Sequence, residues 1–288
     1  MIIVQAALAG ALTGGLFAVM AVGLSLTWGM LRVINLAHFA LISVGAYLTF
    51  QLATSWAIDP ILTLVVSVPV LFAAGAVMQL AFVRLGLTEF NSLIVSFGLL
   101  IIVIQATSNI WSADFQRIDS TINPYATSAV TLGPLVFPTP TLLAFVFGAV
   151  IVGGAQLALS RTYPGRALRA FAQDRVIAAA FGIDHVRLGA LLAGFAGATA
   201  AVAGMLFAIS NALIPTAPYE WVGVVFAVVI LGGIGDAVGT FLAGIVVGAV
   251  SGVVSVVLSP AAAPLVIFSA VILALALRPG GVFARRRA

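Results

Sequence analysis

The sequence contains no cysteine and almost no charge. Charged residues make up 7% of its 288 residues, whereas hydrophobic residues make up 63%. A water-soluble domain needs about a quarter of its residues charged to cover its surface, so the lipid bilayer is the solvent in which this chain folds. The absence of cysteine excludes disulfides, a thiolate nucleophile and cysteine metal ligands.

Apolar runs of about 20 residues, the length that crosses the hydrocarbon core, recur along the chain. They predict one all-α polytopic membrane domain over residues 1–288, with about nine transmembrane helices and a range of about eight to ten. The predicted spans are residues 5–29, 33–54, 61–83, 92–112, 139–159, 188–209, 219–233, 238–258 and 263–277. No basic segment precedes the first run, which indicates a retained span and not a cleaved signal peptide.

The distribution of arginine predicts the orientation. With the N-terminus outside and the C-terminus in the cytoplasm, only Arg117 of the twelve basic residues lies outside, beside Asp114 and Asp119. The positive-inside rule favours this orientation, and basic residues at span ends do not indicate nucleic-acid binding. The arginines predicted to be cytoplasmic are Arg32, Arg84, Arg161, Arg166, Arg169, Arg175, Arg187, Arg278, Arg285, Arg286 and Arg287.

Two connections between spans have informative patterns. The segment LGGIGDAVG, Leu231–Gly239, ends the short seventh span, and its glycines with Asp236 indicate either a tight turn or a re-entrant break. The external connection, Trp111–Pro138, has Asn-Pro and Gly-Pro steps that predict turns and short extended pieces without a soluble domain. It is either a platform for an external partner or an ordinary loop.

The most polar segment is SRTYPGRALRAFAQDRVIAAAFGIDHVR, residues 160–187, with five of the arginines and two of the eight acids. We expect two short helices there. On the first, one face carries Arg166, Arg169 and Gln173 and another carries Leu168, Phe171 and Ala172. Asp174 suits the N-cap of the second helix, Gly182 suits its C′ position, and Asp184 can cap the next span. A loop with a cap at each joint is folded, which favours a docking role, although short helices also occur between spans without one.

Three blocks of sequence, in this order, resemble a known family. Gly23–Leu48, GLSLTWGMLRVINLAHFALISVGAYL, and Val224–Phe283, with VVFAVVILGGIGDAVGTFLAGIVVGAV and RPGGVF, look like the N- and C-terminal signatures of the branched-chain amino acid group of ATP-binding-cassette (ABC) importer permeases, the LivH type. Between them, GRALRAFAQD and AAAFGID resemble the coupling loop of that family. Two positions depart from its pattern: Phe39 stands where glycine is usual, which leaves the solute open, and Arg175 stands where proline is usual.

The resemblance implies an ABC importer permease fold in the bacterial inner membrane. It also implies four kinds of partner: membrane lipid, a second permease subunit, two ATP-binding subunits and an extracytoplasmic solute-binding protein. The residues implied in coupling to the ATPase are Arg166, Arg169, Phe171, Gln173, Asp174, Gly182 and Asp184. Phe171 is expected to anchor the loop, because buried aromatic side chains contribute most at such interfaces.

Polar residues inside spans are few and invite a functional interpretation. Asn35 and His38 share one face near the start of the second span and could form a gate, or a hydrogen-bonded contact between helices. The candidates for a solute path or gate are Asn35, His38, Asn91, Ser96, Gln105 and Asn211, which could equally bond to backbone. Gly244 and Gly248 form a GxxxG pattern, a weak signal of helix packing.

No catalytic, nucleotide-binding or metal motif is present, and the two histidines are far apart in the sequence. We therefore expect no cofactor and no metal site, with ATP hydrolysis on partner chains. The sequence favours a permease subunit that imports branched-chain amino acids or a related small polar solute such as urea, an amide or an aromatic acid. The alternative is a stand-alone secondary transporter or channel.

Overall fold

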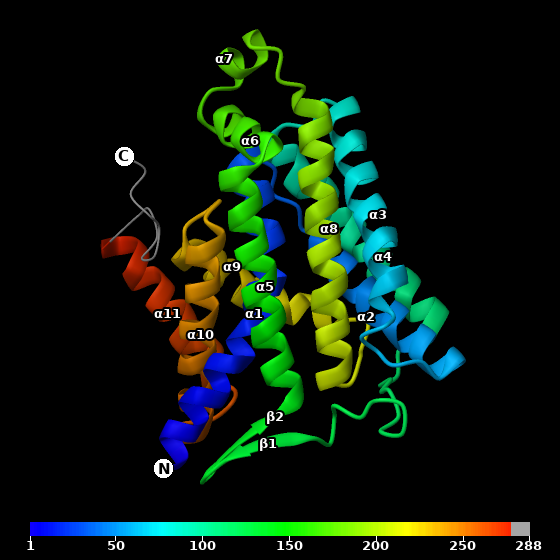
Figure 1. Cartoon of the computed structure of the whole chain (residues 1–288), viewed down its shortest axis with the longest axis vertical. Coiled ribbons are helices and arrows are strands. Elements are labelled where there is room, and N and C mark those ends of the chain that lie inside the picture. Colours follow the sequence, from blue (N-terminus) through cyan, green and yellow to red (C-terminus); the bar gives the residue numbers. More distant parts are fainter. Residues whose placement is uncertain (278–288) are drawn as a thin grey trace.

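Apolar helices alternate in direction through the computed structural model, which describes residues 1–277 (Figure 1). The helices that match the predicted spans are α1 Ile2–Leu31, α2 Ala37–Trp56, α3 Leu64–Arg84, α4 Glu89–Trp111, α5 Thr139–Arg161, α8 His185–Ser210, α9 Ala217–Gly232, α10 Ala237–Val257 and α11 Ala262–Leu277. Seven of these are long and apolar enough to cross a membrane, while α9 and α11 are shorter apolar helices. The predicted all-α polytopic fold is confirmed, and a full crossing by α9 and α11 stays a prediction.

Two short helices and a hairpin lie at opposite ends of the bundle. Helices α6, Tyr163–Gln173, and α7, Arg175–Ala180, lie at one end, and strands β1, Ala129–Leu132, and β2, Leu135–Pro138, lie at the other (Figure 1). The ends of α1, α3 and α5 bring further arginines to the α6 end, whereas Arg117 lies in the segment that leads to the hairpin. Most arginines of residues 1–277 thus lie at the α6 end, and the orientation across the membrane stays a prediction. Arg278, Arg285, Arg286 and Arg287 and the predicted cytoplasmic C-terminus lie outside the described residues.

Helices α1 and α10 pack closely because glycines face each other across the contact. A Cβ atom added at Gly14 would collide with the carbonyl of Gly244, and one added at Gly248 would meet the backbone of Gly10 and Gly14. Small residues of this kind let membrane helices approach to backbone contact, where dispersion forces are strongest. The GxxxG pattern in α10 therefore marks a real helix interface.

The predicted turn between α9 and α10 is tight. It is four residues long, with Gly233 at φ 91° and Gly235 at φ 84°. Residues with a Cβ atom rarely adopt these backbone conformations. The carboxylate of Asp236 accepts a hydrogen bond from the Gly239 N–H at 2.9 Å and so caps α10. Ser25 of α1 accepts the Gly235 N–H at 3.1 Å, which fixes the turn against the bundle.

The outer segment, residues 112–138, contains the antiparallel β1–β2 hairpin but no separate domain, as predicted. Gln116 pairs with Leu213 through two backbone hydrogen bonds of 3.0 and 2.7 Å. The side-chain amide of Asn123 donates to the Ile209 carbonyl at 3.0 Å. These contacts hold the outer segment against the end of α8.

Candidate functional site

The polar loop at residues 160–187 is folded as its sequence predicts, and each joint is capped. The carboxylate of Asp174 accepts the N–H groups of Val176 and Ile177 at 2.8 and 2.9 Å, which starts α7. Gly182 has φ 76°, and its N–H donates to the Ala179 carbonyl at 2.9 Å. The following residue, Ile183, donates to the Ala178 carbonyl, which completes a Schellman motif at the end of α7.

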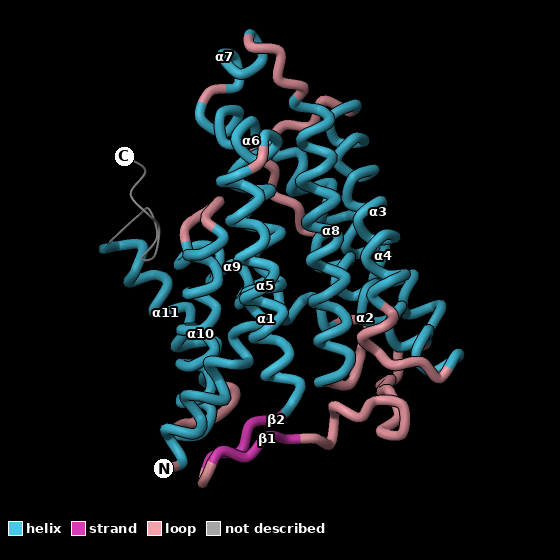
Figure 2. The backbone as a smooth tube through the Cα atoms, in the orientation of Figure 1, coloured by secondary structure: helices cyan, strands magenta, loops and turns pink. Residues whose placement is uncertain are grey.

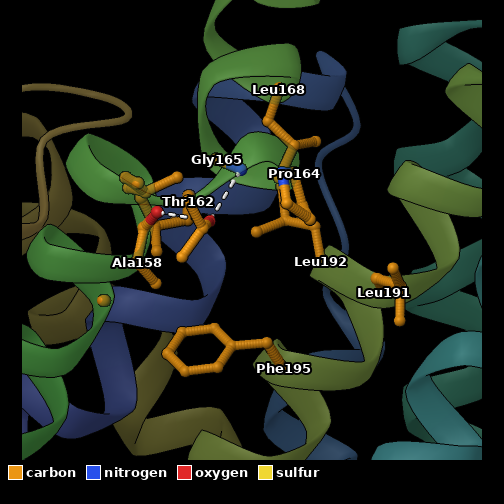
Figure 3. A pocket seen from close by; sticks show the side chains of 11 residues that line it. Ala158, Thr162, Pro164, Gly165, Leu168, Leu191, Leu192 and Phe195 are labelled. Carbon is orange, nitrogen blue, oxygen red and sulfur yellow. Dashed lines mark hydrogen bonds between the residues drawn. The ribbon is translucent and has the colours of Figure 1, made fainter. Parts of the chain in front are cut away.

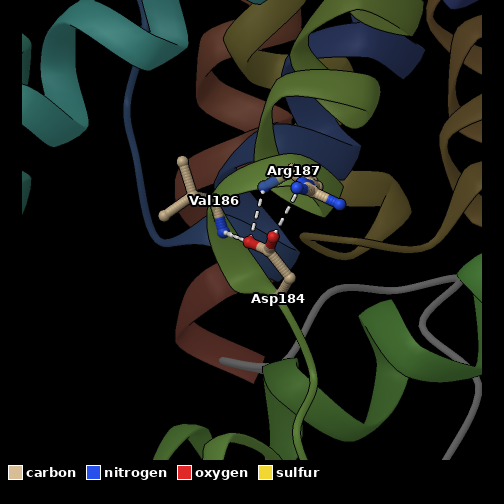
Figure 4. A network of polar contacts seen from close by, with 3 residues as sticks. All are labelled: Asp184, Val186 and Arg187. Carbon is tan, nitrogen blue, oxygen red and sulfur yellow. Dashed lines mark hydrogen bonds and ion pairs between the residues drawn. The ribbon is translucent and has the colours of Figure 1, made fainter.

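Asp184 ends the loop and starts α8. Its carboxylate accepts the N–H groups of Val186 and Arg187, both at 3.1 Å, and forms an ion pair with the Arg187 guanidinium at 3.0 Å (Figure 4). The negative charge lies at the positive end of the α8 dipole, where it is favourable. The direction in which α8 enters the bundle is therefore fixed by local contacts.

Helix α6 divides into the two faces that the sequence predicts. Arg166, Arg169 and Gln173 are exposed, whereas Leu168 and Phe171 are buried against the spans. Beneath α6 lies an open apolar cavity of about 160 Å³, bounded by α5, α6 and α8 (Figure 3). Thr162, which accepts the Gly165 N–H at 3.2 Å, starts α6 at the rim of this cavity.

Phe171 packs within this chain. Its side chain is only 8% exposed and belongs to the same apolar cluster as Leu26, Leu31 and Leu192 of the membrane helices. The ring is parallel to the imidazole of His185, with centroids 5.7 Å apart and an interplanar angle of 5°. Within this chain the Phe171 ring therefore braces α6 on the spans, and its expected role in anchoring the loop on an ATPase stays a prediction.

Three large apolar side chains on and after α7 are exposed. Val176, Ile177 and Phe181 are 80%, 57% and 82% exposed, and together they form what we call the α7 apolar face. These residues lie in the pattern RVIAAAFG, but the sequence analysis placed the apolar anchor on the first helix of the loop and did not predict a role for them. An exposed apolar cluster on a charged loop is typical of a protein interface.

Arg175 joins the loop to the first span. Its guanidinium donates a hydrogen bond to the carbonyl of Leu31, the last residue of α1, and lies 5.1 Å from the centre of the Phe171 ring. Burial and the nearby charge of Arg32 lower the pKa of Arg175, and Glu89 opposes that shift. The sequence predicts Arg175 to be cytoplasmic and shows it as a replacement for proline, but it does not predict this contact.

The link between α1 and α2, residues 32–36, is not helical and runs from the α6 end into the bundle (Figure 2). Backbone N–H and C=O groups that no helix pairs need other hydrogen-bond partners inside the bundle. Ser96 of α4 is such a partner. Its hydroxyl accepts the Leu36 N–H at 2.9 Å, and its one hydrogen is shared between the Ile34 carbonyl at 3.3 Å and the Leu93 carbonyl of α4 at 3.1 Å. Ser96 therefore stabilises the α1–α2 link across a sequence separation of 60 residues.

Two further candidates lie at the same link. The Asn35 amide nitrogen contacts Met78 sulfur at 3.9 Å, and within the described chain its buried Oδ1 has no hydrogen-bond partner. His38 is buried, and its Nε2 lies 2.9 Å from the Met20 carbonyl of α1. Phe39 beside it stacks on Phe226 of α9, with ring centroids 6.3 Å apart. Asn35 and Ser96 thus lie at the α1–α2 link, and His38 follows in the first turn of α2, against α1; we refer to the three as the cluster at the α1–α2 link.

The other path candidates do not join this cluster. Asn91 and Gln105 are exposed on α4, and Gln105 bonds to Asn109 of the same helix at 3.3 Å. Asn211 ends α8 at the hairpin end, where it lines a cavity of about 280 Å³ between α1, α5, α8 and the outer segment. That cavity has both polar and apolar lining, including Thr13 and Ser210.

The outer segment is also tied to the connection between α2 and α3. The Tyr125 hydroxyl donates to the Asp59 carboxylate at 2.7 Å. Burial and this hydrogen bond to the carboxylate, together with its charge, raise the pKa of Tyr125 to about 12. In the same segment, hydrogen bonds from the backbone and hydroxyl of Thr121 lower the pKa of Asp119. Among residues 1–277 no group of three His, Asp or Glu side chains is placed to hold a metal ion.

Comparison with known proteins agrees with this architecture. The family model described as the permease component of the branched-chain amino acid transport system matches residues 6–276. The high-affinity branched-chain amino acid transport permease BraD of Pseudomonas aeruginosa is 26% identical over 96% of this chain and 94% of its own length. LivH of Escherichia coli K12 is 24% identical with the same two coverages. A probable LivH of Methanocaldococcus jannaschii is 28% identical over 80% of this chain and 75% of its own. No solved structure gives a significant match.

Proposed function

The chain belongs to the permease-component family of branched-chain amino acid transport systems, and we propose that it is the membrane subunit of an ABC importer for these amino acids or a related small polar solute. In this proposal it pairs with a second permease subunit and two ATP-binding subunits in the bacterial inner membrane. An extracytoplasmic binding protein delivers the solute at the hairpin end. ATP hydrolysis takes place on the partner chains.

The observation that carries the proposal is the α7 apolar face. Val176 and Phe181 are at least 80% exposed on a capped loop at the arginine-rich end of the bundle. That end is cytoplasmic in the orientation that the arginines favour, so the face is open to a soluble ATPase. Exposed arginines Arg166 and Arg169 on α6 add charge beside it and can orient the partner.

The solute path is proposed to pass the cluster at the α1–α2 link. A break in helical structure within the membrane leaves polar groups available only where protein or a cavity surrounds them. The buried Asn35 Oδ1 is an acceptor that a solute ammonium or amide could use. The names of the matched relatives, which are branched-chain amino acid permeases, favour these amino acids over urea.

The docking step is tested with Phe181→Ser and Val176→Ser. Both substitutions remove exposed apolar area without opening a core, so the chain inserts normally. We expect ATPase association to weaken by about 1–3 kcal/mol for Phe181→Ser, the usual range for an interface aromatic. Leu85→Ser is the matched control, because Leu85 is 68% exposed at the same end but outside the loop. Equal association of all three variants with the ATPase contradicts the proposal.

Orientation is tested separately with single cysteines, which the cysteine-free sequence allows. A cysteine at Arg169 is expected to react only from the cytoplasm, and one at Asp119 only from outside. External labelling at position 169 contradicts the docking proposal, because a cytoplasmic ATPase cannot reach that face.

The solute and the dependence on ATP are tested in proteoliposomes that contain the purified complex and its binding protein. Uptake of labelled leucine or valine is expected only with ATP inside, with urea and phenylalanine as competing candidates. Uptake by this chain alone, without ATPase subunits, would support a stand-alone transporter or channel.

A further inference from the structure

We propose that Arg175 is a positioning residue that couples the docking loop to the α1–α2 link, an inference that rests on the proposed function. In residues 1–277, the Arg175 bond to Leu31 is the hydrogen bond that connects α7 to a membrane helix. Ala178 is the buried residue of α7, so the helix has little apolar contact of its own with the spans. Besides the packing of α6 on α1, the Arg175 side chain therefore gives a force on α7 a direct route to the end of α1.

The receiving end of this contact is suited to a cation. The Leu31 carbonyl is among the last four of α1, which lack partners within the helix and carry the negative end of its dipole. Arg32 directly after it adopts a left-handed conformation, φ 53° and ψ 41°, so α1 ends abruptly. Arg175 thus caps α1 from a different part of the chain.

The Arg175 guanidinium also contacts an aromatic ring. Arg175 and His185 both contact the Phe171 ring: the guanidinium carbon lies 5.1 Å from its centre, and the imidazole is stacked on it with centroids 5.7 Å apart. A cation over an aromatic face is attracted by the ring electrons, and a planar guanidinium suits this geometry better than an ammonium. The three residues connect α6, α7 and α8 as one unit.

The α1–α2 link begins one residue after Leu31, and its inner end is held by the Ser96 hydroxyl. Because Ser96 holds the inner end of the link, a displacement of Leu31 at the Arg175 contact would change the backbone conformation of residues 32–36. Asn35, the candidate solute contact, lies within this link. The contact at Arg175 places the docking surface and the candidate gate at opposite ends of one short segment.

Arg175→Pro separates this role from folding of the loop. Proline is favoured at the first position of a helix, and Asp174 already has φ −145° and ψ 111°, the extended conformation that a following proline requires. The variant keeps α7 and its apolar face but loses the contact with Leu31. Arg175→Lys keeps the charge but loses the planar group, and Arg161→Ala is a control that removes an arginine from the same end.

In the reconstituted complex, Arg175→Pro is expected to bind the ATPase within about twofold of the parent. Solute transported per ATP hydrolysed is expected to fall about fivefold or more, the lower range for coupled sites. Arg175→Lys should lie between Arg175→Pro and the parent, and Arg161→Ala should match the parent. Hydrogen exchange at residues 32–36 should rise in Arg175→Pro and stay unchanged in Arg161→Ala.

Three results overturn the role of Arg175: unchanged transport per ATP in Arg175→Pro, unchanged exchange at the link, or a loss of ATPase binding as large as in Phe181→Ser. The last result would make Arg175 a docking residue. Failure of the docking proposal itself is read from Phe181→Ser, whose association would then equal that of the parent. The exchange measurement on the permease still tests the link contact in that case.

Discussion

The Nε2 atom of His38 on α2 lies 2.9 Å from the carbonyl oxygen of Met20 on α1, in the buried interior of the bundle. The contact joins the two helices that flank the α1–α2 link. It corresponds to the interhelical contact that the sequence allowed as one of two roles for this histidine. A gate role would require the imidazole to change partners during transport.

We expect His38→Ala to lower the free energy of unfolding by about 1–3 kcal/mol, from a lost hydrogen bond and a new cavity. Thermal unfolding in detergent measures this change. Gln105→Ala is the control, because Gln105 is exposed on α4 and should change stability by less than about 0.5 kcal/mol. A His38→Ala protein with parental stability and altered solute uptake would instead identify a gate.

Ser96→Ala tests the anchor of the link. Removal of the hydroxyl leaves the Leu36 N–H and the Ile34 carbonyl without their side-chain partner. A buried unsatisfied group costs about 1–3 kcal/mol, so stability should fall and the Leu36 amide should exchange faster. Ser108→Ala on the same helix removes a hydroxyl that bonds only to the Ile104 carbonyl one turn away, and it should have little effect. Equal exchange at Leu36 in the two variants would show that Ser96 does not hold the link.

Local patterns made the spans and the caps predictable. Asp174 and Asp184 bond to N–H groups two and three residues away, so their roles follow from the adjacent sequence alone. The membrane spans can be predicted equally well, because an apolar run of sufficient length has no stable alternative to the bilayer.

Contacts between distant residues were not predictable. Ser96 and Leu36 are 60 residues apart, and Arg175 and Leu31 are 144 apart, with no pattern that connects either pair. Phe171 shows a different limit. An amphipathic helix has an apolar face in the sequence, but that face can pack on its own spans or on a partner, and periodicity is the same in both cases.

Gly14→Ala tests the α1–α10 contact. The added methyl group would meet the Gly244 carbonyl, which cannot move without displacing α10. We expect a loss of about 1–3 kcal/mol or a failure to fold, measured as folded yield and unfolding temperature. Gly98→Ala on α4 is the control: a Cβ there meets nothing within 4 Å, so helix propensity should raise stability by about 0.5–1 kcal/mol. A tolerated Gly14→Ala together with a harmful Gly98→Ala would contradict this packing.

Phe171→Ala and Asp174→Ala test whether loop structure, and not only its exposed face, is needed for ATPase coupling. Phe171→Ala removes the ring that braces α6 on the spans and supports Arg175. Asp174→Ala leaves the Val176 and Ile177 N–H groups uncapped, at a cost of about 1 kcal/mol. A helix of six residues has little stability of its own, so loss of its cap should disorder the α7 apolar face.

We therefore expect both variants to insert in the membrane but to reduce ATPase association and solute-stimulated hydrolysis. Tyr163→Ala is the matched control for the aromatic change, because Tyr163 begins the same helix but is 70% exposed. The loss of folding stability should be smaller for Asp174→Ala than for Phe171→Ala, since a lost cap costs less than a lost buried ring. If both variants bind the ATPase and stimulate hydrolysis like the parent, the loop at residues 160–187 is not the coupling element, and the α7 apolar face must have another partner.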